Sequence, residues 1–307
     1  MPYLGEVSAL LTAMCWTVSS ATFAVSSRRA GASATNHFRL WLALPVLWLL
    51  VWVTTGRPWP GELGAARTGL LVASGVIGLV LGDLGYFVAL ARIGPRVASV
   101  LMTTWPAFAL LFGLFLGEWP DAGMLLGVSL TVCGVLLVLL RSRETSNWNP
   151  DLTRRQWAWG VAGALLGAVG QALGAILARR AMAAGPDLPL GGAPLDATLV
   201  RMAAGVFGAQ IVALVQRRPF DGLAVLRDRR ALAGALCGTA FGPVLGIWLS
   251  MVAMHHAREV GVASALIATT PLFMMPVAWR FYRARIGALG LIGTLLAVGG
   301  VAVLFLR

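Results

Sequence analysis

Lysine is absent from this chain of 307 residues, and all 24 basic residues are arginines. Chemistry that depends on lysine, such as phosphate binding by a Walker lysine or Schiff-base formation, is therefore excluded. Cysteine is scarce, and Cys15, Cys133 and Cys237 have no paired spacing, so they predict neither a disulfide framework nor a metal site. The apolar sequence also lacks a grouping of His, Cys, Asp or Glu that would supply a nucleophile with a base. We expect no catalytic residues, no cofactor and no metal.

Charge is scarce as well, because only 12% of the residues are charged while 58% are hydrophobic. Soluble domains carry about 25% charged residues, and the mean hydropathy here is +0.82. The composition therefore predicts an integral membrane protein. Apolar runs long enough to cross a bilayer predict an all-α fold of about ten transmembrane helices, near residues 4–26, 37–54, 69–91, 97–117, 122–140, 157–178, 197–216, 231–254, 261–281 and 286–306.

No basic residue precedes the first apolar run, whereas Arg28 and Arg29 follow it, so we expect a retained span rather than a cleaved signal peptide. The net charge of +12 comes from arginines between spans, which favours anionic lipid rather than nucleic acid as the partner. Most of these arginines lie in every second connection between spans, and these connections share one side of the membrane. The opposite side of the membrane holds only Arg57, Arg67, Arg179, Arg180, Arg201, Arg258 and Arg307. By the positive-inside rule, this asymmetry predicts that both termini lie outside the cytoplasm.

An internal repeat organises the chain. Residues 97–108 recur as residues 262–273, an offset of 165 residues without a gap. The repeat predicts two five-helix units, residues 1–140 and 156–307, joined by a polar linker at 141–155. Because five is odd, the second unit should enter the membrane inverted, with a binding site near the bilayer midplane between the two halves.

Glycines recur every three or four residues in the third, sixth and eighth predicted spans, which predicts close helix packing. The segment from Arg217 to Arg230 alternates arginines with Phe220, Leu223 and Leu226, which is typical of a short interfacial helix.

Asp83 is the only carboxylate well inside a predicted span, where an unpaired charge costs about 3 kcal/mol or more. Tyr86 lies on the same helical face. Two hypotheses follow for Asp83: a transport role as coupling-proton site or cation partner, or an ion pair or hydrogen bond that fixes two helices. Arg39 and Arg201, which open the second and seventh spans, either extend to the interface or attract an anionic substrate.

Other polar and aromatic residues within the spans suit a cavity for a small amphipathic molecule. The candidate substrate-binding residues are Trp16, Ser19, Ser20, Asp83, Tyr86, Trp105, Gln171 and Trp248. Pro106 and Pro271 occupy equivalent repeat positions and predict helix kinks, either compensated by Thr104 or Thr269 or lining the cavity. Tryptophans beside the spans are expected at the membrane interface, namely Trp59, Trp119 and Trp148.

Short motifs follow one another in a fixed order: Tyr86-Phe87-Val88-Ala89-Leu90, Val97-Ala98-Ser99, Trp105-Pro106, Gly117-Glu118 and Gly134-Val135. Part of the order returns in the second copy as Val262-Ala263-Ser264, Thr270-Pro271 and Gly299-Gly300. With ten spans in two repeats, the chain resembles the drug/metabolite transporter superfamily, specifically its EamA-type branch. The second copy departs from the pattern, because Tyr282-Arg283 replaces the glycine-glutamate pair.

The resemblance implies a multi-pass protein of the cell inner membrane that moves small metabolites or drugs by alternating access. We expect efflux of amino acids or similar amphipathic compounds. An intramembrane enzyme, a lipid-handling protein and a passive channel are the alternatives, and inverted duplication favours a carrier over a channel. The resemblance also implies cytoplasmic termini, contrary to the arginine distribution.

Overall fold

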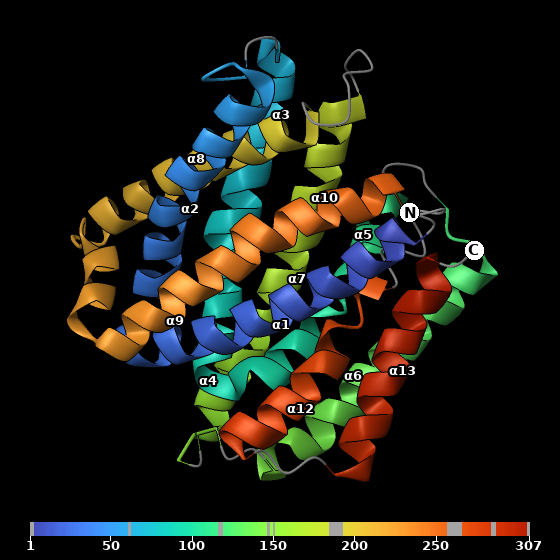
Figure 1. Ribbon diagram of the computed structural model, residues 1–307. Helices are drawn as coiled ribbons and strands as arrows, with labels where there is room; N and C mark the ends of the chain where they lie inside the picture. Colours follow the sequence, from blue (N-terminus) through green and yellow to red (C-terminus); the bar gives the residue numbers. More distant parts are fainter. Residues whose placement is uncertain are drawn as a thin grey trace.

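The computed structural model describes residues 3–60, 63–115, 119–145, 148–149, 151–183, 193–256, 266–283 and 287–305 (Figure 1). These residues are helical almost throughout, and no strand occurs among them. Seven helices in the described ranges are long and apolar enough to cross a membrane, by length and composition. The predicted all-helical membrane fold is confirmed.

The helices of the first repeat are α1 (Leu4–Ala30), α2 (Ala32–Thr55), α3 (Ala65–Gly75), the π-helix η1 (Val76–Gly82), α4 (Asp83–Met102), α5 (Trp105–Leu114) and α6 (Ala122–Thr145). Those of the second repeat are α7 (Arg154–Ala183), α8 (Ala193–Val215), the 3-10 helix η2 (Asp221–Arg227), α9 (Arg229–Thr239), the π-helix η3 (Ala240–Gly246), α10 (Ile247–His256), α12 (Thr270–Tyr282) and α13 (Ala288–Phe305). The predicted ninth run lies partly outside the described residues.

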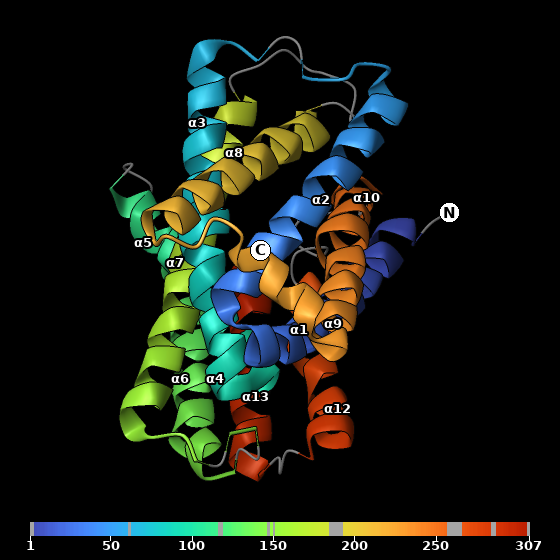
Figure 2. The same ribbon diagram turned by 90° about the vertical axis from the view of Figure 1, so that its left-hand side faces the viewer.

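The two repeats exchange their first helices. α1 packs along α9, η3 and α10 of the second repeat, whereas α7 packs along α3, η1 and α4 of the first. α1 and α7 run in opposite vertical directions in Figure 1, and Figure 2 shows α7 beside the column formed by α3 and α4. Each repeat therefore completes the packing of the other.

Glycines bring these exchanged helices into close contact, as their spacing predicts. A Cβ atom at Gly85 of α4 would lie only 2.6 Å from the carbonyl oxygen of Gly163 in α7. Serines join the same pairs of helices, since Ser74 donates to the Gly174 carbonyl at 2.6 Å and Ser19 donates to the Gly238 carbonyl at 2.9 Å. Backbones this close leave no room for side chains between them.

The last helices of the repeats, α6 and α13, pack antiparallel through small residues. Gly134 faces the backbone of Gly293 and Ala297, and the Thr131 hydroxyl donates to the Ala297 carbonyl at 3.4 Å. Gly299 is the equivalent of Gly134 in the second repeat, by the offset of 165 residues. A Cβ atom at Gly299 would have no atom within 4 Å. Equivalent glycines thus differ in their surroundings.

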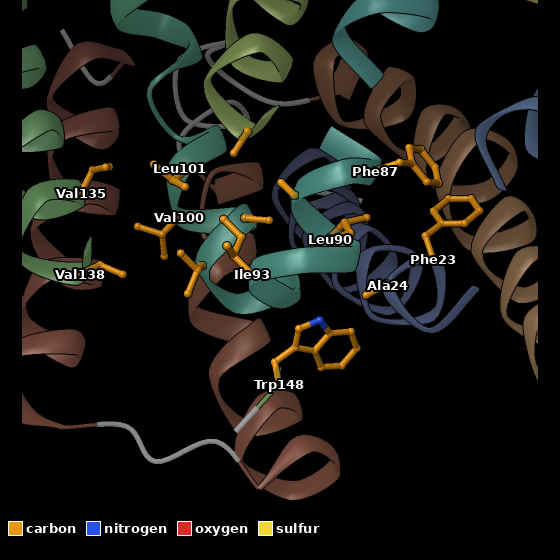
Figure 3. Packing of buried hydrophobic residues seen from close by; sticks show 14 of the residues in the cluster. Phe23, Ala24, Phe87, Leu90, Ile93, Val100, Leu101, Val135, Val138 and Trp148 are labelled. Atoms are coloured by element: carbon orange, nitrogen blue, oxygen red, sulfur yellow. The ribbon is translucent and has the colours of Figure 1, made fainter. Parts of the chain in front are cut away.

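The polar linker between the repeats contributes a buried tryptophan. α4 bends at Gly94, whose φ of 82° is followed by Pro95. Beside this bend, the Trp148 indole N–H donates to the Ala91 carbonyl at 3.0 Å, and the Asn149 amide donates to the same carbonyl at 3.0 Å. Figure 3 places Trp148 below the turn that carries Ile93.

The expected interface position of Trp148 is therefore wrong. Its side chain is only 8% exposed, because it covers carbonyls that the Gly94–Pro95 bend leaves without helical donors. Its ring also meets the Tyr282 ring edge-on at 4.7 Å. Trp59 and Trp119, in contrast, are 49% and 85% exposed.

Replacing Trp148 by phenylalanine should lower the free energy of unfolding by about 1 kcal/mol. The ring is largely retained, and the Ala91 carbonyl keeps the Asn149 donor, so one hydrogen bond is lost. Chemical or thermal unfolding in detergent measures the change. Trp119→Phe, at an exposed site, is the matched control, and an equal loss in both variants would contradict the assignment.

The predicted kinks at Pro106 and Pro271 are wrong, because each proline begins a new helix instead of bending a continuous one. α4 ends at Met102 and α5 starts at Trp105, so Pro106 lies in the first helical turn, and Pro271 has the same place in α12. A first turn needs no N–H from proline, which makes a break less costly than a kink. Both prolines are buried.

Threonine hydroxyls satisfy carbonyls at both breaks. Thr104 donates to the Leu101 carbonyl at 2.7 Å, and its repeat counterpart Thr269 donates to the Leu266 carbonyl at 2.6 Å. The sequence predicted that Thr104 and Thr269 compensate for the prolines, and both hydroxyls bond to carbonyls of the turn before the break.

A short helix occurs, as predicted, between α8 and α9, where η2 carries exposed Leu223 and Leu226. Asp228 follows η2 and caps α9 by accepting the backbone N–H groups of Arg230 and Ala231 at 2.8 and 2.9 Å. The Arg29 side chain donates to the same carboxylate at 2.8 Å. This contact fastens the end of α1 to the start of α9.

The bond from Arg29, followed by that from the Ala231 N–H, lowers the pKa of Asp228 from 3.8 to about 2. Since the folded pKa is depressed, the stabilisation is complete above the unfolded value of about 4 and is lost as the pH falls through the folded value of about 2. Asp228→Asn should therefore melt at a lower temperature than the unsubstituted protein at pH 6, and the difference should shrink as the pH falls from 4 through 2. A difference that is as large at pH 2 as at pH 6 would contradict the charge-based cap.

Candidate functional site

Asp83 is the first residue of α4, directly after the π-helical turn η1. Its carboxylate forms a salt bridge with the Arg39 guanidinium of α2, with 2.5 Å between Nη2 and Oδ2. The two side chains are 21% and 9% exposed, respectively. One hypothesis expected Arg39 to extend to the membrane interface. That hypothesis is wrong, because the buried carboxylate of Asp83 binds its guanidinium. Two hypotheses were open for Asp83, and the structure shows the ion pair between helices, which joins α2 to α4.

Neighbouring polar and aromatic groups support the buried arginine. Arg39 donates to the Asn36 side-chain oxygen at 2.9 Å, and the Asn36 amide donates to the Leu79 carbonyl of η1 at 3.1 Å. The guanidinium carbon lies 5.2 Å from the centre of the Phe87 ring. Figure 3 shows Phe87 beside Phe23, whose ring centre is 5.0 Å away. A buried ion pair needs such additional partners to offset its desolvation.

π-helical turns occur at matching places in both repeats. The offset of 165 residues carries η1 onto residues 241–247, one residue from the bounds of η3. Such turns are rare in proteins as a whole, and those that occur often lie at functional sites. Only the first carries a charge after it, since the counterpart of Asp83 is Trp248, which is 50% exposed. The pseudo-symmetric scaffold therefore holds an asymmetric charge.

Arg201 of α8 lies beside the same π-helical turn. Its Nε atom is buried and has no hydrogen-bond partner. A Cβ atom at Gly78 of η1, or at Gly174 of α7, would lie 3.5 Å from its Nη2 atom. Asp83 is near enough for its negative charge to stabilise the Arg201 charge. Two arginines and one carboxylate thus gather at the contact of α2, α4 and α8.

A second polar contact joins α1 to α4 one turn beyond Asp83. The hydroxyls of Ser20 and Tyr86 are 2.8 Å apart. The Tyr86 and Phe87 ring centres are 6.4 Å apart, which links this contact to the aromatic pair beside Arg39. The structure thus brings Ser20, Tyr86 and Asp83 into one region.

The other candidate residues lie elsewhere. Ser19 bonds to Gly238, and Trp16 is partly buried against Gly246 of η3. Trp105 is partly buried at the start of α5, and Gln171 is exposed on α7. Among the described residues, Ser19, Trp16 and Gln171 have no hydrogen bond or ring contact with the Arg39–Asp83 pair.

Sequence reasoning missed Asn36, which lies one residue before the predicted second span. Its spacing of three residues from Arg39 was the available signal, because it places both on one helical face. No group of three or more His, Cys, Asp or Glu side chains in the described ranges is placed to hold a metal ion.

The sequence matches the EamA-like transporter family over residues 3–140 and again over residues 158–306. No curated protein matches the chain. A solved structure titled "Crystal structure of protein" aligns over 100% of this chain and 98% of its own, with a TM-score of 0.62 and 16% sequence identity. At that identity, the likeness shows a shared fold only.

Proposed function

Because this chain belongs to the EamA-like transporter family, a family of membrane transporters of small molecules, we propose that it is a secondary transporter that works by alternating access. The proposed cargo is an amino acid or a similar amphipathic compound, and the proposed direction is export across the cell inner membrane. The proposal includes a coupling proton that binds Asp83. Binding of this proton requires the ion pair with Arg39 to open during transport.

The single observation that carries the proposal is the family match to both halves of the chain. The exchanged helices support it, since α1 and α7 contact the opposite repeat through smooth glycine faces. Small-residue faces allow one bundle to slide or rock against another without unlocking side chains. A rocking motion around a site between repeats is how alternating access operates.

Counterflow in proteoliposomes tests the proposal. Vesicles loaded with unlabelled amino acid should accumulate the labelled compound transiently, and the initial rate should saturate with concentration. Flux without saturation or counterflow would instead indicate a channel. Chemical conversion of the compound would indicate an enzyme, and the absence of flux above that of empty vesicles would contradict transport of this class.

A further inference from the structure

The charge at the junction of α2, α4 and α8 is unbalanced. Asp83 is bonded to Arg39, which is also bonded to Asn36. Among the described residues, Arg201 has only a longer-range interaction with the same carboxylate. Two guanidinium groups thus share one negative charge, and all three residues belong to candidate membrane-spanning helices. An uncompensated arginine is costly there, so an anion at this point would be strongly favoured.

The guanidinium of Arg201 has backbone rather than side chains beside it, because a Cβ atom at Gly78 or Gly174 would lie 3.5 Å from Nη2. The Nε atom is buried without a hydrogen bond, while the residue as a whole is partly exposed. Within the described ranges, its terminal nitrogens take part in no hydrogen bond or salt bridge. The planar guanidinium therefore has donors available for a bidentate partner.

We propose that Arg201 binds the carboxylate of the transported molecule, in a site bordered by η1, α7 and α8. This inference rests on the proposed transport function and names its substrate class: small carboxylates, with or without an amino group. The Arg39–Asp83 pair has a separate part, because it keeps one arginine neutralised and leaves the positive charge of Arg201 for the substrate.

Paired compounds that differ only in the carboxylate test the proposal. Leucine and phenylalanine are compared with leucinamide and phenylalaninamide in counterflow, and by the rise in melting temperature of the purified protein. We expect the acids to be transported and stabilising at concentrations at least about tenfold lower than the amides, the difference typical of a charge-assisted bidentate contact. Equal transport of acids and amides would overturn the inference while leaving the transport function intact.

Variants at Arg201 separate a binding role from a structural one. Arg201→Gln should raise the half-saturating concentration of the acids at least about tenfold, leave that of the amides unchanged, and melt no lower than the unsubstituted protein without ligand. Arg201→Lys should keep part of the preference for acids, and it serves as the test if the glutamine variant fails to fold. Arg218→Gln, at an exposed site, is the matched control. A preference for acids that survives in Arg201→Gln would overturn the assignment, as would its loss in the lysine variant. Absence of counterflow for all four compounds would overturn the transport proposal for this class together with the inference.

Discussion

Replacing Asp83 by asparagine is expected to lower the free energy of unfolding by about 3 kcal/mol or more, the usual cost of breaking a buried ion pair. Asparagine can still accept a hydrogen bond from Arg39, but it cannot neutralise the charge. Arg39 is 8% exposed, so water cannot compensate for the missing carboxylate. Unfolding of the purified protein in detergent, followed by circular dichroism, measures the loss.

The double variant Arg39→Gln with Asp83→Asn supplies the control for this prediction. It removes both charges, so it should recover most of the stability lost in the single variant. Unchanged stability in Asp83→Asn would show that the pair does not stabilise the fold. If pH-driven accumulation then disappeared while exchange persisted, the alternative hypothesis of a proton site at Asp83 would gain support.

Replacing Gly134 by leucine should destabilise the contact of α6 and α13 by about 3 kcal/mol, or prevent folding altogether. A Cβ atom there would overlap the backbone of Gly293 and Ala297, and backbone atoms cannot move aside without separating the helices. Overpacking of a tight contact typically costs 1–3 kcal/mol, and more when no side chain can yield.

Gly299→Leu is the matched control, because the repeat places this glycine at the equivalent position of α13. Its Cβ position has no neighbour within 4 Å, and the residue is exposed, so leucine should be accommodated with little change in stability. Yield of folded protein and melting temperature in detergent compare the two variants. Equal effects would show that the contact of α6 with α13 is not as close as the structure indicates.

The helices and the two repeats could be predicted because both follow from local properties of the chain. The length of an apolar run fixes whether it crosses the bilayer, and the recurrence of residues 97–108 at 262–273 is visible without any structure. The exchange of α1 and α7 could not be predicted, since repeat symmetry allows each first helix to pack on either copy.

The candidate site was predicted in part. Asp83 was singled out by the cost of its charge, but its partner depends on how α2 lies against α4, which periodicity does not reveal. Arg39 was therefore expected either at the interface or beside an anionic substrate, and its pairing with Asp83 was not foreseen. Trp148 was misplaced for a similar reason, since a polar linker gives no sign of the carbonyls that Gly94 and Pro95 expose.

The exchange of first helices has a consequence for biogenesis. When the first repeat has been synthesised, the glycine face of α3, η1 and α4 is still uncovered, and α1 still lacks α9 and α10. α7 closes the first of these contacts and α9 the second, so each half leaves helix faces uncovered until the other half has been inserted. A half-length ancestor with this packing would have required a second copy of itself, inserted in the opposite orientation, before its helices were fully covered.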